Sequence, residues 1–254
     1  MPQNANSNDD LTRSGNNSTQ ARMVNDYFKI TSAINSNSGN YQKNIAGLKR
    51  GLKHWLDVKG KRVLDLGSGT GELCLLANRM GAESVIGVNL SQDEIDFAKP
   101  YVQATFYCQD ILSYLLQCPA ESVDVIFAMN ILEHLMKDEM VKVLEQSRRV
   151  LKDGGQLIAM VPNATSSYGA MTRYWDITHL QSFTPSSVQQ VMRLCGFSKA
   201  EFSEWGPRPH GIVSFSRYLL WQMIRLAIRL RLMIETGSSK GGIYTADMLF
   251  RFTK

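Results

Sequence analysis

The chain has 254 residues, of which 44% are hydrophobic and 20% are charged, so it is not disordered overall, not collagen-like and not a disulfide scaffold. Its formal net charge is +5, and residues 213–254 supply the whole excess with seven basic and two acidic side chains. No cluster of basic residues interleaved with aromatic ones occurs, so we expect no nucleic-acid partner.

The N-terminal part is predicted as a polar tail over residues 1–22 and a helical cap over 23–60, with a break at 35–40. A regular alternation of apolar strands and helices follows, which indicates β-α-β units and a parallel sheet covered on both faces. The predicted strands are Arg62–Leu66, Ser84–Val88, Ala104–Tyr107, Val123–Met129 and Gln156–Val161. The predicted helices are Glu72–Met80, Ser91–Lys99, Ile111–Leu116 and Lys137–Leu151.

The rhythm changes after Pro162. Residues 163–183 are too long and too aromatic for an ordinary connection, so we predict a functional loop there. Thr184 and Pro185 then have the residue types of a helix N-cap and first helical position, and the helix should stop at Gly196. Two more strands are predicted over Phe197–Trp205 and Tyr244–Phe252, with an insert over 206–243 between them.

The strongest motif is a glycine-rich turn directly after the first of these strands. Gly67, Gly69 and Gly71 alternate there, so a ligand can approach the backbone, and the N-terminus of the next helix offers N–H donors. Glu72 stands where a dinucleotide-binding fingerprint requires its third glycine, which disfavours a nicotinamide-dependent oxidoreductase.

This G-x-G-x-G spacing after Asp65 resembles class I S-adenosylmethionine-dependent methyltransferases, and the resemblance extends from about Arg62 to Phe197. It implies a Rossmann-like α/β fold with a seven-stranded, mostly parallel sheet, helices on both faces, an N-terminal helical cap and a helical insert between the last two strands. Residues 61–254 would form the methyltransferase domain. The implied cofactor is S-adenosyl-L-methionine, with S-adenosyl-L-homocysteine as the product.

The resemblance also assigns the cofactor contacts. They fall on Asp65, Gly67, Ser68, Gly69, Gly71, Asn89, Leu90, Asp110, Ile111, Met129 and Asn130. The family has an acidic residue for the ribose hydroxyls where this chain has Asn89, which can hydrogen-bond a diol but lacks the charge of a carboxylate. Asp110 would accept from the adenine amine, and Ile111 would pack on the ring.

Catalysis of methyl transfer to an alcohol calls for a general base, because a hydroxyl group is a weak nucleophile until its proton is removed. The segment Leu132–Leu135 (LEHL) resembles its counterpart in ubiquinone-type O-methyltransferases. His134 and His179 are the candidate bases, with His134 favoured, although His134 could also be a packed or capping histidine. Cysteine and histidine spacing shows no metal-ligand pattern, so no metal is predicted and the four cysteines should be reduced thiols.

The block Arg173–Thr184, with its D-x-T-H and F-T elements, resembles bacterial methyltransferases of polysaccharide and O-antigen clusters. It implies a polar acceptor bound by Arg173, Tyr174, Trp175 and Asp176, and a leading function of O-methylation of a sugar in a bacterial surface polysaccharide or its precursor. The alternatives are O-methylation of a small aromatic or quinone precursor, or a non-catalytic binding module on the same fold. The loop could also be purely structural, with His179 capping the next helix.

The insert contains a predicted amphipathic helix over residues 213–234. On a helical wheel Arg217, Gln222, Arg225 and Arg229 fall within about 140°, and the remaining face is mainly apolar. The helix would pack on the domain or on a partner subunit of a homodimer, or it would lie on a membrane with Trp221 near the headgroups. The polar first twenty residues and the lack of a run of about 18 apolar residues favour a cytoplasmic protein without a signal peptide or spanning helix, at most at the inner face of the plasma membrane.

Overall fold

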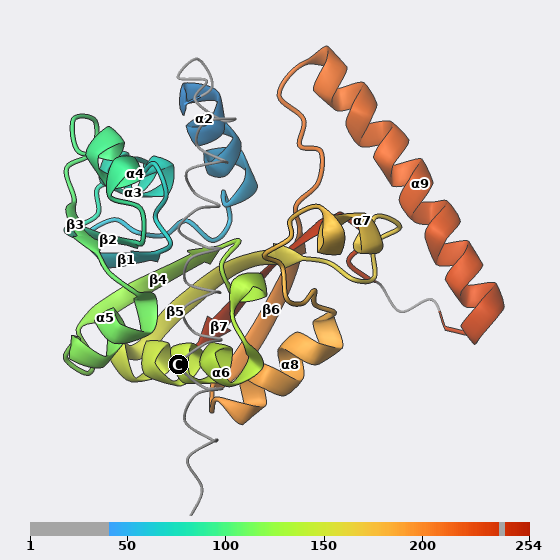
Figure 1. Ribbon diagram of the computed structural model, residues 1–254. Coiled ribbons are helices and arrows are strands. Elements are labelled where there is room, and N and C mark those ends of the chain that lie inside the picture. The colour runs from blue at the N-terminus through green and yellow to red at the C-terminus, as the bar shows by residue number, and fades with distance from the viewer. Residues whose placement is uncertain (1–40, 239–241) are drawn as a thin grey trace, which may run out of the picture. The chain divides into compact units, whose positions relative to one another are not determined.

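The computed structural model describes residues 41–238 and 242–254 (Figure 1). In this part of the chain seven strands form one sheet in the order β3-β2-β1-β4-β5-β7-β6, in which only β7 runs antiparallel to its neighbours. The strands are β1 (Arg62–Leu66), β2 (Ser84–Asn89), β3 (Thr105–Cys108), β4 (Val123–Met129), β5 (Leu151–Pro162), β6 (Lys199–Glu204) and β7 (Asp247–Thr253). The predicted Rossmann-like fold is therefore confirmed.

The helices cover both faces of this sheet. The helical elements of the described residues are α2 (Tyr41–Gly51), α3 (Glu72–Arg79), α4 (Gln92–Ala98), α5 (Ile111–Gln117), the 3₁₀ turn η2 (Leu132–His134), α6 (Lys137–Val150), α7 (Gly169–Tyr174), α8 (Pro185–Leu194) and, standing apart from the sheet in Figure 1, α9 (Ile212–Thr236). No helix of the described residues is long and apolar enough to cross a bilayer.

Two apolar cores explain why the central strands are continuous hydrophobic runs. Side chains alternate along a strand, so Leu64 and Ile126 enter the core on the side of α5, α6 and α8. Val63 and Val125 enter the opposite core, which α2 and α3 cover. A parallel sheet with both faces buried must be apolar on both, and this pattern is what made the fold predictable.

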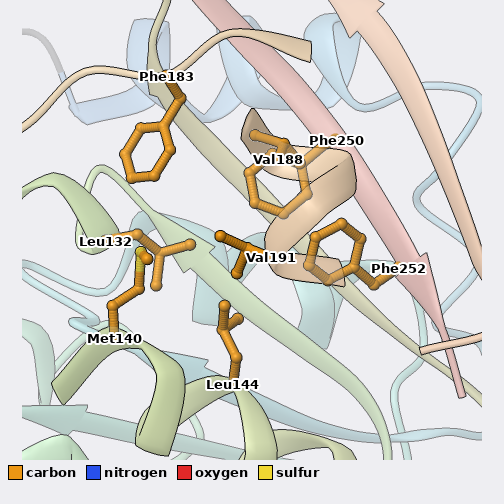
Figure 2. A pocket seen from close by; sticks show the side chains of 8 residues that line it. All are labelled: Leu132, Met140, Leu144, Phe183, Val188, Val191, Phe250 and Phe252. Atoms are coloured by element: carbon orange, nitrogen blue, oxygen red, sulfur yellow. The ribbon is translucent and has the colours of Figure 1, made fainter. Parts of the chain in front are cut away.

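The packing between α6, α8 and β7 leaves almost no free space among the side chains that Figure 2 labels. The gap there has a volume of about 10 Å³ and is lined by eight apolar side chains. That volume holds at most a single water molecule, so this region is core and not a ligand site.

The larger differences from the predicted element boundaries, of three residues or more, lie in three places. The strand β5 begins at Leu151, directly after α6, because Val123 pairs with Leu151 before a bulge restores the pairing at Gln156. The last strand begins at Asp247 and not at Tyr244. The predicted loop 163–183 contains the short helix α7.

Some of the other local predictions are confirmed, and others concern residues outside those that the structure describes. The side chain of Thr184 caps α8 as expected, with Pro185 in its first turn. All four cysteines are free thiols. The helix α2 forms part of the predicted cap, whereas the predicted tail and residues 23–40 of the cap lie outside the described residues. The domain boundaries remain predictions.

Candidate active site

The carboxyl ends of β1, β2, β3 and β4 meet at one edge of the sheet, which is where ligands bind in open α/β folds. The glycine-rich turn after β1 is held there by Gly67 and Ser68, whose N–H groups both donate to the carbonyl of Val88 at 2.8 and 3.0 Å. The predicted cofactor contacts Asn89, Asp110 and Asn130 lie at or just after the ends of the other three strands. The parallel arrangement of these strands therefore brings them to the same edge of the sheet as the glycine-rich turn.

Positive φ angles at Gly67, Gly69 and Gly71 require glycine, but the three residues have different surroundings. A Cβ on Gly67 would lie 2.0 Å from Ile131, and one on Gly71 would lie 3.0 Å from Ala98, so both glycines are needed for packing. A Cβ on Gly69 would meet nothing within 4 Å. Gly69 therefore presents its backbone to open space at the ligand-binding edge.

Asp65 is buried beneath this turn. The Sγ of Cys74 donates to its Oδ2 at 3.4 Å, and burial raises the pKa of Asp65 to about 7. These contacts support a structural role for the carboxyl group, and its assignment as a cofactor ligand stays a prediction.

Asn89 is also buried, and its side-chain amide contacts the carboxylate of Glu94. The Nδ2 of Asn89 donates to Oε2 of Glu94 at 2.8 Å, while Ser91 caps α4 by accepting from the N–H of Glu94. Burial raises the pKa of Glu94 above its ordinary value. Glu94 was not predicted from the sequence. The visible signal was a carboxylate five residues after Asn89, the position at which this chain lacks the family's acidic residue.

The remaining predicted cofactor contacts have mixed surroundings. Asp110 caps α5 by accepting from the N–H of Ser113 at 2.8 Å, which leaves its second carboxylate oxygen for another donor. Ile111 is buried and Leu90 is exposed. Asn130 has a φ of 56°, a left-handed conformation that asparagine tolerates better than most residues and that often marks functional sites. Met129, which precedes Asn130, is partly buried.

The helix α2 contacts the glycine-rich turn directly. The hydroxyl of Tyr41 donates to the carbonyl of Thr70 at 3.2 Å, and Asn44 donates to Glu72, which in turn accepts from the Thr70 hydroxyl. These contacts tie the described part of the predicted cap to the turn. Tyr41 is the first residue of the predicted cap that the structure describes.

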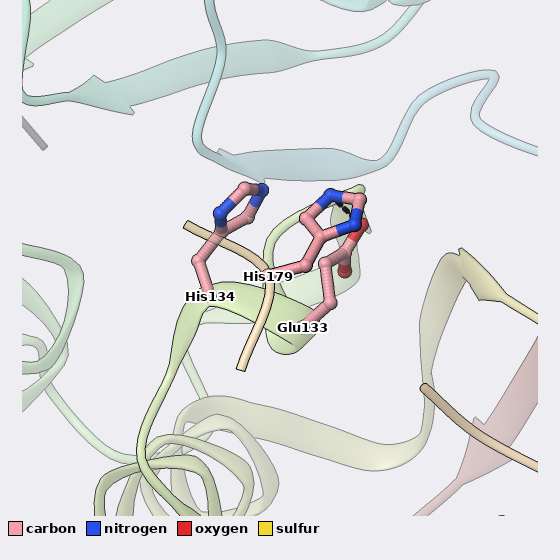
Figure 3. Close-up of side chains that lie close together, drawn as sticks. All are labelled: Glu133, His134 and His179. Carbon is pink, nitrogen blue, oxygen red and sulfur yellow. Dashed lines mark ion pairs between the residues drawn. The ribbon is translucent and has the colours of Figure 1, made fainter. Parts of the chain in front are cut away.

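The two candidate bases lie together, as Figure 3 shows. The ring centroids of His134 and His179 are 4.8 Å apart and the rings meet edge to face. His134 belongs to η2, after β4, and His179 belongs to the loop after α7. Two further contacts fasten this loop to η2, because Leu180 donates its N–H to the carbonyl of Glu133 at 2.8 Å and Gln181 donates to the carbonyl of Leu132.

Hydrogen bonds define which nitrogen of His134 carries a proton. The Thr178 hydroxyl donates to Oδ1 of Asp176 at 2.7 Å, so it must accept from Nδ1 of His134 at 2.8 Å. The Nε2 of a neutral His134 therefore bears a lone pair. Burial, reinforced by His179, lowers the pKa of His134 to about 4, so the ring is neutral at pH 7.

Glu133 is a residue that the sequence analysis left without a role. It is only 1% exposed, and neither carboxylate oxygen has a hydrogen-bond partner among the described residues. Burial raises its pKa to about 8. Its Oε1 lies 4.0 Å from Nε2 of His179, whose Nδ1 donates to the carbonyl of Thr172 at 2.9 Å.

These three side chains are also the group in the described part of the chain that could hold a metal ion. One ligand atom from each of Glu133, His134 and His179 lies within 4.8 Å of the others. Two imidazoles and a carboxylate are ordinary ligands of Zn²⁺ and related ions. The absence of a metal therefore stays a prediction.

The predicted acceptor residues divide into exposed and buried ones. Tyr174 and Trp175 are 79% and 78% exposed, and the guanidinium of Arg173 stacks over Tyr174 while donating to the carbonyl of Leu180. Asp176 is buried and orients Thr178, which holds His134. Its assignment as a substrate ligand stays a prediction.

A groove is lined by residues that follow the two histidines in the sequence. Its volume is about 270 Å³, near the lower end of the roughly 300–1,000 Å³ range of ligand sites. It is lined by residues 135–138 and by Leu180 and Gln181. Leu135 follows His134 and Leu180 follows His179, so the groove is a candidate acceptor site.

A family model described as a methyltransferase domain matches residues 63–155, which contain the carboxyl ends of β1, β2, β3 and β4. Residues 63–155 therefore form a methyltransferase domain. The ubiquinone biosynthesis O-methyltransferase of Coxiella burnetii is 32% identical to the chain over 111 residues, 42% of this chain and 45% of that enzyme. The enzyme of the same name from Bradyrhizobium diazoefficiens is 33% identical over 106 residues, 41% of each chain. The chain thus spans less than half the length of these relatives.

The fold of the methyltransferase domain is shared more widely than its sequence. A solved S-adenosylmethionine-dependent methyltransferase from Archaeoglobus fulgidus matches with a TM-score of 0.62 at 20% identity, over 84% of this chain and 94% of that one. Family and fold imply S-adenosylmethionine as the cofactor.

The residues at the strand ends fit this cofactor. The open space over Gly69 leaves room for a ligand against the backbone, and the unpartnered hydroxyl of Ser68 lies in the same turn. Asn89 with Glu94 offers an amide and a charged carboxylate to a diol, and Asp110 has one carboxylate oxygen to spare for an amine.

A variant of Glu94 tests whether its charge compensates for Asn89. We expect Glu94→Gln to weaken S-adenosylhomocysteine binding about tenfold, because hydrogen bonds to a charged group are worth roughly 1 kcal/mol more than neutral ones. Asp93→Asn removes the same charge from the exposed side of the same helical turn and should leave the affinity unchanged. Isothermal titration calorimetry of both variants decides, and equal affinities would rule out the compensating role.

Proposed function

We propose that the protein transfers a methyl group from S-adenosylmethionine to a hydroxyl oxygen of a sugar in a bacterial surface polysaccharide or its precursor. The observation that carries the reaction type is the neutral His134, whose Nε2 lone pair is fixed by the hydrogen bonds through Thr178 and Asp176. The cofactor supplies a methyl group on a positively charged sulfur, which an oxygen nucleophile can attack in line.

The protein's own part is to position the acceptor and to take its proton. As the new C–O bond forms, the hydroxyl proton becomes strongly acidic, so a base with a pKa as low as about 4 can accept it. The carboxyl group of Asp176 acts on His134 through Thr178 and favours the protonated ring that results. His179, edge to face with His134, is suited to hold the acceptor or to help orient it.

Support for a saccharide acceptor comes from the loop that carries Tyr174 and Trp175. Exposed aromatic rings beside an arginine provide apolar faces and donors, a combination suited to a hydroxyl-rich ring. A second candidate, a small aromatic or quinone precursor, is favoured by the names of the two relatives. Transfer of labelled methyl to a panel of nucleotide-linked and lipid-linked saccharides, with catechols in parallel, separates the two. Labelling of the catechols alone would overturn the saccharide proposal.

Replacing His134 should separate catalysis from cofactor binding. We expect His134→Ala to lower kcat about 10²- to 10⁴-fold, as is typical when a general base is lost, while S-adenosylhomocysteine affinity stays within about twofold. In the parent the rate should persist as the pH falls and decline only near pH 4, because the base acts while neutral, above its lowered pKa. His210→Ala, at an exposed histidine outside the site, is the control. Normal turnover by His134→Ala would contradict the assignment.

A further inference from the structure

The helix α9 contacts the rest of the domain through polar groups and leaves many large apolar side chains exposed. Its side facing the domain carries polar groups, because Trp221 donates from Nε1 to Oε2 of Glu204 at 3.4 Å and Arg225 pairs with the same carboxylate at 3.3 Å. Ser214, about two turns before Trp221 and three before Arg225, is the buried residue of the helix. One of the placements considered from the sequence put Trp221 near lipid headgroups, but Trp221 instead contacts Glu204 at the end of β6, which also pairs with Arg225.

The opposite side of α9 is apolar and exposed. At about 100° per residue, six large apolar side chains fall within about 80°, centred opposite Trp221. We call them the outer stripe; each is at least 47% exposed, and they are Ile212, Leu219, Met223, Leu226, Leu230 and Ile234. A continuous apolar stripe along a 25-residue helix is far more exposed apolar surface than scattered single residues would give, and such patches mark interaction sites.

Arginines border the outer stripe on both sides. Arg231 lies along one edge and Arg229 along the other, each about 60° beyond the stripe, while the stripe itself contains no charge. Neither Arg217 nor Arg229 forms an ion pair among the described residues, and the one acidic residue of the helix, Glu235, lies 3.9 Å from Arg231. The excess positive charge of the whole chain lies in this same C-terminal region.

We propose that α9 lies flat on an anionic lipid surface, with the outer stripe among the acyl chains and the bordering Arg229 and Arg231 on the lipid phosphates. An apolar face bordered by cations is the pattern of interfacial helices. The charge argues against a second copy of this chain as the occupant, because pairing two such stripes would bring their bordering arginines together with little acid to neutralise them. The proposal does not depend on the methyl-transfer reaction.

Vesicle flotation of the full chain tests this inference. We expect binding to vesicles made of equal parts phosphatidylglycerol and phosphatidylcholine, and much weaker binding to phosphatidylcholine alone. Met223→Glu with Leu230→Glu should reduce binding at least about tenfold, since two charges would enter the acyl region. Leu194→Glu, which makes the same kind of change at another exposed apolar side chain, on α8, should have no effect.

A second variant tests the charge separately. Arg229→Glu with Arg231→Glu should weaken binding to the anionic vesicles by at least about fivefold per reversed residue and leave binding to the neutral ones unchanged. Circular dichroism and the Tm establish that all variants are folded. The proposal is overturned if the parent chain floats with neither vesicle, or if the stripe variants float as the parent does. It is also overturned if the parent is a dimer that the stripe variants convert to a monomer without any vesicle binding.

Discussion

Gly69→Ala should weaken S-adenosylhomocysteine binding by at least about tenfold. The space above Gly69 is open, and the new methyl group would occupy the position that the cofactor needs against the backbone. Tenfold corresponds to about 1.4 kcal/mol of binding free energy, a modest demand for a steric overlap. Isothermal titration calorimetry gives the affinity and thermal unfolding gives the cost in stability.

Gly60→Ala is the matched control for this variant. Gly60 also has a positive φ, 67° against 50° at Gly69, and a Cβ there would likewise meet nothing within 4 Å. It lies before β1, at the opposite edge of the sheet from the glycine-rich turn. Both variants should lose about 1–2 kcal/mol of stability from left-handed strain, but only Gly69→Ala should lose affinity. Equal affinities in the two variants would mean that the cofactor does not lie over Gly69.

Glu133→Gln should make the protein more stable at high pH. The folded state raises the pKa of Glu133 from 4.5 to about 8, so between these values it holds a proton that the unfolded chain releases. The free energy of unfolding therefore falls as the pH rises through this interval, by about 5 kcal/mol once the pH exceeds 8. Glutamine keeps the shape without titrating, so the variant should equal the parent at pH 4 and exceed it by up to that amount at pH 9.

Urea unfolding at pH 4, 6, 8 and 9 measures this difference. Some pH dependence should persist in the variant. The raised pKa of Asp65, about 7, also makes the free energy of unfolding fall as the pH rises. His134 acts with the opposite sign, since its lowered pKa makes stability rise with pH between about 4 and 6.5. Glu145→Gln, the same change at an exposed side chain on α6, should leave the curve unchanged. Parallel curves for parent and Glu133→Gln would refute the account of Glu133.

The strands and the glycine-rich turn could be predicted because their signals are local. Val123–Met129 is a continuous apolar run that becomes β4 with the expected bounds, and the alternating glycines mark the turn that needs positive φ. The start of β5 could not be found in this way. Leu151 joins the sheet only because Val123 lies opposite it, and nothing in Lys152–Gly155 has strand character of its own.

The features of the site that were not predicted depend on contacts between distant parts of the chain. The tautomer of His134 depends on Thr178, 44 positions away, and the burial of Glu133 depends on the loop that closes over η2. The helical wheel identified a polar arc on α9 but not its direction, because the partner of Trp221 is Glu204 on β6. Periodicity shows which side of a helix is polar, and tertiary contacts determine where that side points.

The most direct test of the central claim is a calorimetric titration of the parent chain with S-adenosylhomocysteine. A methyltransferase site at the ends of β1 to β4 predicts saturable, micromolar binding of one molecule per chain, weakened by Gly69→Ala and not by Gly60→Ala. No detectable heat at several temperatures, or binding that Gly69→Ala leaves intact, would contradict it.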